Sequence, residues 1–465
     1  MNKTVVINVV GLTPKLLGSS TPRLSAWAAQ ASVARIKPAF PAVTCTAQAN
    51  YLTGRYPAEH GVVGNGWYSQ DECEVRFWRQ SNKLVQAQKI WEAAKAVDSS
   101  FTCANLFWWF NMYSTVDYSV TPRPMYLADG RKLPDIYTSP ASLRDDLQSS
   151  IGGFPLFDFW GPRASIRSTR WIAEAAKHVE RKFNPTLTVI YLPHLDYNLQ
   201  RLGPSGPAIE NDLRQVDEIC GELIASYELR GAQVIVLSEY GLCDVSSPVH
   251  LNRVLREHGL IAVREELGLE LLDPGASAAF AVADHQIAHV YVNDRKRLHQ
   301  VRTILENTPG VDLVLTKDQQ AAYRVDHPRS GDFVVVARPD AWFTYYYWLD
   351  DQKSPDFART VDIHRKPGYD PVELFLDPQI RVPALTIGWK LLKKSCGFRT
   401  LIDVIPLDAS LVKGSHGRPA DWTDDGPILM SRQKDFVSAA SVQSVDVYEL
   451  ILKHLGACRE RIEAN

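Results

Sequence analysis

The sequence lacks three features that would assign it to a special class of protein. Its seven cysteines are odd in number and show no C-x-x-C spacing, so we expect free thiols rather than a disulfide framework or a zinc ribbon. Its 51 basic and 53 acidic residues nearly cancel, which indicates neither a nucleic acid nor a membrane as partner. No apolar run has the length of a membrane span or a signal peptide, and we therefore expect a cytoplasmic protein.

What remains is the composition of a large α/β protein. A chain of 465 residues with 45% hydrophobic and 22% charged content can bury a sizeable core. Continuous apolar runs at residues 4–10, 187–192 and 233–237 predict strands that are buried on both faces of a parallel sheet, and amphipathic helices alternate with them. We expect a single α/β domain over residues 1–465, with aromatic-rich cap insertions around residues 100–165 and 265–380.

Residues 37–68 hold the densest group of candidate functional side chains. Pro41 ends an extended stretch, and Thr44 and Thr46 stand where a helix is expected to begin. A hydroxyl at a helix N-terminus faces unpaired backbone N–H groups and the positive end of the helix dipole, which favour an anion beside it. Thr44 is therefore placed as a nucleophile toward phosphate, with simple helix capping as the alternative.

The order of motifs in this segment resembles a known family. The string P-A-V-T-C-T, followed by L-T-G-R-Y-P and H-G-V-V-G-N-G-W-Y, is similar to the nucleophile segment of the nucleotide pyrophosphatase/phosphodiesterase family of the alkaline phosphatase superfamily. Residues 361–375 resemble its phosphonoacetate-hydrolase-like members. The resemblance runs from Thr4 to about His416 and implies an alkaline-phosphatase-like, mostly parallel sheet with helices on both faces.

The resemblance also implies roles for single residues. Thr44 takes the place of the nucleophile and metal-bridging hydroxyl. Asn65 takes the place of the side-chain amide that hydrogen-bonds a phosphoryl oxygen, with a turn residue in the stretch from Gly64 to Gly66 as the alternative.

The metal-ligand positions that the resemblance implies are only partly kept. Val10 stands where the family has an Asp, and valine cannot coordinate a metal. Gln200 and Tyr240 stand where the family has His, and Glu239 replaces an Asp. Asp196 and His416 match.

The chemistry of the replacements weakens the first metal position most. A glutamate is still a hard oxygen ligand, but a phenol with an ordinary pKa of about 10 must lose its proton before it binds a metal. From the resemblance we expect one divalent ion, zinc, rather than two, held by Asp196, His416 and Glu239. A site without metal is the alternative.

Several other polar residues are candidates for the pocket. His194 precedes Asp196 by two residues and substitutes for the missing ligand if this stretch is extended; the alternative is a histidine that is only hydrogen-bonded nearby. The pair Asp284-His285 is interpreted as structural or pocket-lining. Aromatic clusters around residues 107–113 and 154–160 are either core or the walls of a pocket with Arg123 at its rim.

The function that the resemblance implies is hydrolysis of a phosphodiester or pyrophosphate in a small organic or nucleotide-like substrate. Thr44 and Asn65 are the expected catalytic residues, and Tyr240, Gln200, His194 and Arg123 the expected substrate contacts. Two alternatives stay open. One is a non-phosphate or metal-independent biosynthetic enzyme on the same fold, and the other is a catalytically inactive relative that binds a ligand. The sequence leaves the oligomeric state undetermined.

Overall fold

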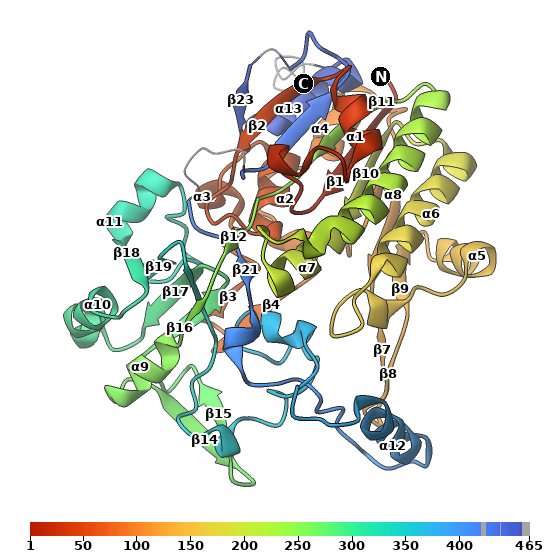
Figure 1. Ribbon diagram of the computed structural model, residues 1–465. Helices are drawn as coiled ribbons and strands as arrows, with labels where there is room; N and C mark the ends of the chain where they lie inside the picture. Colours follow the sequence, from red (N-terminus) through yellow and green to blue (C-terminus); the bar gives the residue numbers. More distant parts are fainter. Residues whose placement is uncertain (420–424, 438, 458–465) are drawn as a thin grey trace.

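One large sheet carries most of the core, and its middle strands are the apolar runs of the sequence. The computed structural model describes residues 1–419, 425–437 and 439–457 and is shown in Figure 1. In spatial order the strands of this sheet are β23 (Ser441–Gln443), β2 (Ser32–Lys37), β22 (Ile428–Ser431), β11 (Gln233–Leu237), β1 (Thr4–Val9), β10 (Leu187–Leu192), β5 (Cys103–Leu106), β6 (Tyr118–Pro122) and β9 (Ile136–Ser139).

The sheet is mostly parallel, as predicted. β1 pairs in parallel with β10 on one side and with β11 on the other, so that Val6 lies between Val189 and Ile235. β22 and β9 run antiparallel to their neighbours. Because β1 and β10 are buried along their whole length, they read as continuous apolar runs rather than as an alternating pattern.

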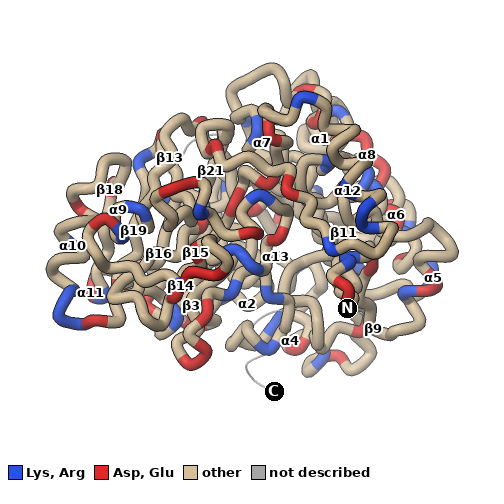
Figure 2. The backbone as a smooth tube through the Cα atoms, turned by 90° about the horizontal axis from the view of Figure 1, so that it is seen from below, with Lys and Arg blue, Asp and Glu red and all other residues tan. Residues whose placement is uncertain are grey.

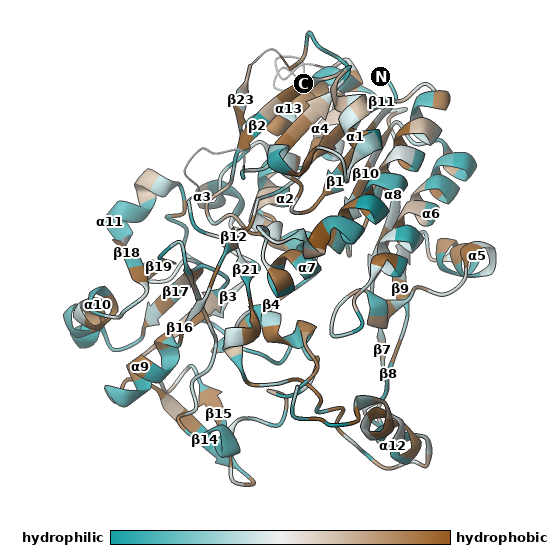
Figure 3. Cartoon of the chain, viewed as in Figure 1, coloured by the Kyte–Doolittle hydropathy of each residue, from teal (hydrophilic) through white to brown (hydrophobic). Residues whose placement is uncertain are grey.

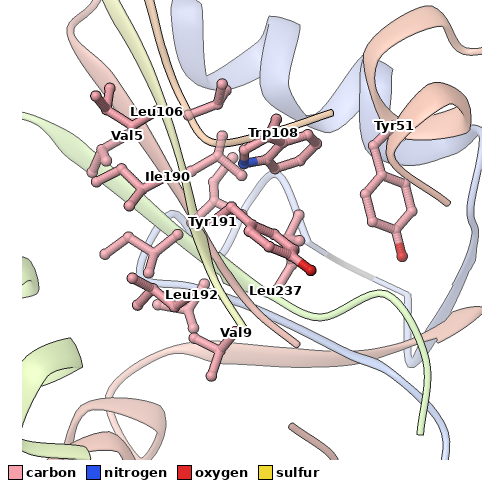
Figure 4. Packing of buried hydrophobic residues seen from close by; sticks show 14 of the residues in the cluster. Val5, Val9, Tyr51, Leu106, Trp108, Ile190, Tyr191, Leu192 and Leu237 are labelled. Atoms are coloured by element: carbon pink, nitrogen blue, oxygen red, sulfur yellow. The ribbon is translucent and has the colours of Figure 1, made fainter. Parts of the chain in front are cut away.

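Helices cover both faces of the sheet. α1 (Pro22–Ala28), α6 (Ile166–Phe183) and α8 (Glu210–Leu229) pack together on one face, and α2 (Thr44–Thr53), α4 (Ile90–Val97) and α13 (Asp446–Leu455) lie on the other. Figure 4 shows the interior, where Trp108 and Tyr51 meet side chains of the central strands. Phe107 and Trp108 are therefore core residues, whereas Tyr113 of the same cluster is exposed.

A second, antiparallel sheet lies beside the first (Figure 1). In spatial order its strands are β16 (Ala279–Asp284), β17 (Ile287–Val292), β19 (Phe333–Ala337) and β18 (Val311–Thr316). It is flanked by α9 (Leu251–Glu257), α10 (Leu298–Glu306) and α11 (Lys317–Gln320). The hairpin of β16 and β17 turns at His285 and Gln286, and this turn lies close to the candidate site described below.

Shorter elements connect and extend these two sheets. They are α3 (Pro57–His60), α5 (Ser142–Ile151), α7 (His194–Leu202) and α12 (Pro383–Ser395), and the strand pairs β3 (Gly66–Ser69) with β4 (Glu74–Phe77), β7 (Met125–Tyr126) with β8 (Lys132–Leu133), β12 (Cys243–Asp244) with β21 (Gly414–Ser415), β13 (Ser247–Val249) with β20 (Ala341–Phe343), and β14 (Ala262–Glu266) with β15 (Leu269–Asp273).

The expectations about free thiols and membrane spans can be compared with the structure for the described residues. The six described cysteines are free, and Cys458 lies outside the described residues. None of the described helices combines the length and the apolar character that crossing a bilayer requires.

Candidate active site

The candidate site lies where the three central strands of the large sheet end. β11, β1 and β10 are neighbours, and they finish at Leu237, Val9 and Leu192. In open α/β sheets, ligands bind outside these carboxyl ends. The segments that follow the strands carry Glu239, Tyr240 and Asp196 into one buried region beside the start of α2.

Thr44 is the first residue of α2, as predicted, and its side chain belongs to a short hydrogen-bonded chain. Its Oγ1 lies 3.1 Å from the hydroxyl of Tyr240, which in turn donates to Oδ1 of Asp196 at 3.4 Å. Burial raises the pKa of Tyr240 well above its ordinary value, and the charges of Asp196 and Glu239 add to this effect. Tyr240 is therefore a protonated phenol between the threonine and the carboxyl, not a phenolate.

The Asp196 carboxyl has a second partner on its own helix. Gln200, one turn further along α7, donates from Nε2 to Oδ2 of Asp196 at 2.6 Å and accepts from the hydroxyl of Tyr369 at 2.8 Å. Burial raises the pKa of Asp196 to about 7, against the two hydrogen bonds from Gln200 and Tyr240 that lower it. Among the described residues, no Lys or Arg forms a salt bridge with this carboxyl. The Asp196 carboxyl therefore gains or loses its proton near neutral pH.

His416 faces Asp196 from the loop that follows β21. Its Nδ1 lies 2.7 Å from the carbonyl oxygen of Ala42, so the proton sits on Nδ1 and the lone pair on Nε2. That Nε2 has no hydrogen-bond partner among the described residues and lies 4.0 Å from Oδ1 of Asp196. Burial lowers the pKa of His416 to about 3, which keeps the imidazole neutral.

Four rings stack through the centre of the site. Tyr240 lies on His416 with 3.6 Å between ring centroids, His416 lies 3.7 Å from His285, and His285 lies 3.7 Å from Tyr369. The stack joins the end of β11 to the hairpin of the second sheet. His285 therefore belongs to the site through its ring contacts, and Tyr369 comes from residues 361–375, the segment that resembles the phosphonoacetate-hydrolase-like members.

Glu239 occupies a separate pocket of amide donors. Its Oε1 accepts from Nδ2 of Asn8 and from Nε2 of Gln48, each at 2.6 Å. Burial raises the pKa of this carboxyl to about 8, and the hydrogen bonds of Gln48, Asn8 and Thr44 offset only part of the shift. Asn8 thus supplies one of the two amide donors of Glu239. The other donor, Gln48, was not among the candidate residues of the sequence.

Asn65 connects the start of α2 to the second sheet. Its Oδ1 accepts from the backbone N–H of Cys45 at 3.0 Å, and its backbone N–H and Nδ2 donate to Asp284 at 2.7 and 3.0 Å. A Cβ on Gly64 would lie 3.1 Å from the same carboxylate, so a glycine permits this approach. Burial raises the pKa of Asp284 to about 7.

His194 does not join this cluster, because the segment after β10 is helical rather than extended. Two residues apart on a helix, His194 and Asp196 point in different directions. His194 bonds from Nε2 to Asp212 on α8 at 2.8 Å. Arg123 is exposed beside Tyr126, with its guanidinium carbon 5.9 Å from that ring, and no recorded contact of the described residues joins it to Thr44.

The donors at the expected metal positions do not fit a resident catalytic zinc. Val10 has no donor atom, and burial keeps the proton on Tyr240. Oε1 of Glu239 accepts two amide N–H groups, while its Oε2 has no hydrogen-bond partner among the described residues. A catalytic zinc takes three protein ligands, yet the described residues contain no group of three His, Cys, Asp or Glu side chains arranged to hold a metal. Asp196, His416 and Glu239 are therefore not assembled into the expected ligand set.

Comparison with known proteins gives one family and several similar folds. A family model described as type I phosphodiesterase/nucleotide pyrophosphatase matches residues 4–370. An uncharacterized pyrophosphatase/phosphodiesterase of Schizosaccharomyces pombe is 24% identical over 252 residues, which are 51% of this chain and 42% of that protein. The chain therefore spans less than half the length of this curated relative.

Two solved structures are similar over nearly the whole chain. An inactive variant of murine ectonucleotide pyrophosphatase/phosphodiesterase 5, in complex with AMP, is 13% identical with a TM-score of 0.58, covering 98% of this chain and 96% of that chain. Phosphonoacetate hydrolase from Sinorhizobium meliloti, in complex with phosphonoformate, is 15% identical with a TM-score of 0.58, covering 98% and 95%. At these identities the likeness establishes the alkaline-phosphatase-like fold, as predicted.

Proposed function

Since the chain belongs to the type I phosphodiesterase/nucleotide pyrophosphatase family, we propose that it hydrolyses a phosphodiester or pyrophosphate bond of a small organic or nucleotide-like substrate, with Thr44 as nucleophile. The observation that carries this proposal is the chain of hydroxyls from Thr44 through Tyr240 to Asp196, with steps of 3.1 and 3.4 Å. A threonine hydroxyl is a weak nucleophile unless a base or a metal activates it. Here the base is Asp196, which acts through Tyr240.

The first half of the reaction forms a phosphothreonine. As Oγ1 of Thr44 bonds to phosphorus, its proton passes to the oxygen of Tyr240, and Tyr240 gives its own proton to the ionised carboxylate of Asp196. The bond from phosphorus to the leaving oxygen breaks, and the leaving oxygen takes a proton from a water molecule on the opposite side.

The second half restores the enzyme. The hydroxide produced from that water attacks phosphorus, and the bond to Oγ1 of Thr44 breaks. The proton returns from Asp196 through Tyr240 to the threonine. The net change is one water consumed and one phosphoester or anhydride bond cleaved. No step requires a metal, in keeping with the poor fit of the donors.

Two further groups of residues suit such a substrate. The half-buried rings of Trp78 and Trp160 lie 5.9 and 5.8 Å from the ring of Tyr369, and they would pack against an aromatic or hydrophobic leaving group. Positive charge gathers around His364, close to Trp78. Burial lowers the pKa of His364 to about 4, and the charges of Lys132, Arg79 and Arg123 add to this effect. Arg123 is thus proposed to attract the anionic part of the substrate.

The test compares two threonines on the same helix. Thr44→Ala should lose at least about 10³-fold in kcat on a nitrophenyl phosphodiester, because it removes the nucleophile. Thr46→Ala is the matched control: its hydroxyl bonds to the carbonyl oxygen of Val62 at 3.2 Å, and we expect kcat to stay within about threefold, since such a hydrogen bond contributes mainly to stability.

A second readout separates catalysis from folding. Mass spectrometry of acid-quenched wild-type enzyme should show a phosphoryl adduct on the peptide that contains Thr44. Turnover that survives in Thr44→Ala contradicts the proposal. Wild-type protein that binds nucleotides but cleaves no phosphodiester or pyrophosphate supports the inactive relative instead.

A further inference from the structure

α12 exposes the apolar face that other helices of this protein bury. Leu385, Trp389 and Leu392 are spaced as i, i+4 and i+7, which places them on one side of the helix. Their exposed fractions are 71%, 58% and 52%, and α12 is the one described helix of eight or more residues without a buried residue. Figure 3 shows this helix at the edge of the molecule with hydrophobic residues on its surface.

The exposed apolar surface extends beyond the helix. Seven of the twenty large hydrophobic side chains that are exposed in the described part of the chain lie between residues 382 and 401. The neighbouring hairpin of β7 and β8 adds Met125 and Tyr126, which are 39% and 50% exposed. Arg399 ties the two parts together, because its Nη2 donates to the carbonyl oxygen of Ala128 at 3.1 Å. Figure 1 shows the hairpin reaching toward α12.

Positive charge surrounds this surface. Residues 378–402 contain five basic and no acidic side chains, although Asp377 and Asp403 flank this range and Asp403 pairs with Lys390. Lys393 lies 5.3 Å from the ring of Trp389, and Arg123 and Lys132 each lie 5.9 Å from the ring of Tyr126. Figure 2 shows Lys and Arg gathered at α12. Exposed aromatic and leucine side chains among lysines and arginines are typical of helices that lie in the interface of an anionic membrane.

We propose that α12 and the β7–β8 hairpin dock the protein on the surface of an anionic lipid membrane, with Leu385, Trp389 and Leu392 entering the headgroup region. The helix lies on the bilayer rather than crossing it, because its 13 residues are too few for a span. Charge complementarity favours an anionic membrane over a second copy of the chain, because a second copy would bring the same basic side chains face to face. The proposal does not depend on the hydrolytic activity.

The test is sedimentation of the full-length protein with vesicles. Wild-type protein should bind vesicles that contain phosphatidylglycerol and bind pure phosphatidylcholine vesicles much more weakly. The double variant Leu385→Ser/Trp389→Ser should bind the anionic vesicles at least about tenfold more weakly, because two apolar side chains no longer enter the lipid. The matched control is Leu229→Ser/Leu267→Ser, which alters two side chains that are 90% and 103% exposed elsewhere and should leave binding unchanged.

Charge is tested separately. Lys393→Glu should weaken binding several-fold and reduce its dependence on salt, whereas Lys296→Glu, at an exposed position on another element, should not. Equal binding of wild-type and Leu385→Ser/Trp389→Ser protein to anionic vesicles overturns the proposal. So does light scattering that shows a wild-type dimer converted to a monomer by this double variant, because the face would then be an interface between copies.

Discussion

Asp196 and Glu239 are two buried carboxyls on either side of Thr44, and their surroundings differ in one decisive way. Glu239 is fully buried, and amide groups from β1 and α2 supply its two recorded donors. Asp196 keeps 11% of its side chain exposed, and it receives one amide and one phenol that also contacts Thr44. Thr44 is near both acids, since it is one of the hydrogen-bond partners of Glu239 and reaches Asp196 through the hydroxyl of Tyr240. Glu239 is held mainly by amides, whereas Asp196 lies at the end of a chain of hydroxyls.

Replacing each acid by its amide tests this difference most strongly. Asp196→Asn should lower kcat by about 10² to 10³-fold, because the relay loses its base. Glu239→Gln should keep kcat within about tenfold, because Gln supplies the same acceptor oxygen to Asn8 and Gln48. Steady-state kinetics on the same phosphodiester measures both. A larger loss in Glu239→Gln than in Asp196→Asn would reverse the assigned roles.

Metal removal tests the interpretation of the donor set. We expect enzyme dialysed against a chelator to retain its activity within about twofold, because fewer than the three protein ligands of a catalytic zinc site are present. Elemental analysis of wild-type protein and His416→Ala checks the metal content directly, with His194→Ala as the matched buried histidine that pairs with Asp212. One ion per chain that disappears only in His416→Ala would establish a one-metal site at Asp196 and His416.

The smallest expected effect is on stability. The pKa of Glu239 is about 8 in the folded protein, against an ordinary value of 4.5. Between these two pH values the folded state keeps a proton that the unfolded state has lost. This contribution is fully present below about pH 4.5 and is lost as the pH rises through about 8. Wild-type Tm should therefore fall across this window, by a few degrees more than that of Glu239→Gln. Thermal unfolding followed by circular dichroism measures the difference, and parallel curves for the two proteins would contradict it.

The α12 surface shows that a balanced total charge can conceal a local concentration of basic side chains. The totals of 51 basic and 53 acidic residues favoured no membrane contact, yet five basic side chains gather within residues 378–402 without an acidic one. The apolar face of α12 has helical spacing in the sequence. No local sequence pattern distinguishes an exposed apolar helix face from one that packs on the core. The exposure of the α12 face is therefore seen only in the structure.

Local residue patterns were enough to predict the central strands and the start of the helix that carries Thr44. β10 and β11 have the predicted bounds, because each is a short apolar run between turn signals. α2 begins at Thr44, as the chain after Pro41 predicts. These features depend on neighbours a few residues away, and the residues themselves carry that information.

The partners of the site side chains became known from the tertiary structure. Asn8 meets Glu239 across 231 positions, Gln48 meets it across 191, and Asn65 meets Asp284 across 219. Tyr369, which no local pattern singled out within residues 361–375, completes the ring stack. Because α7 is helical, His194 bonds to Asp212 and does not face Thr44. Contacts at such separations depend on how the two sheets pack together, and no local pattern of residue types encodes them.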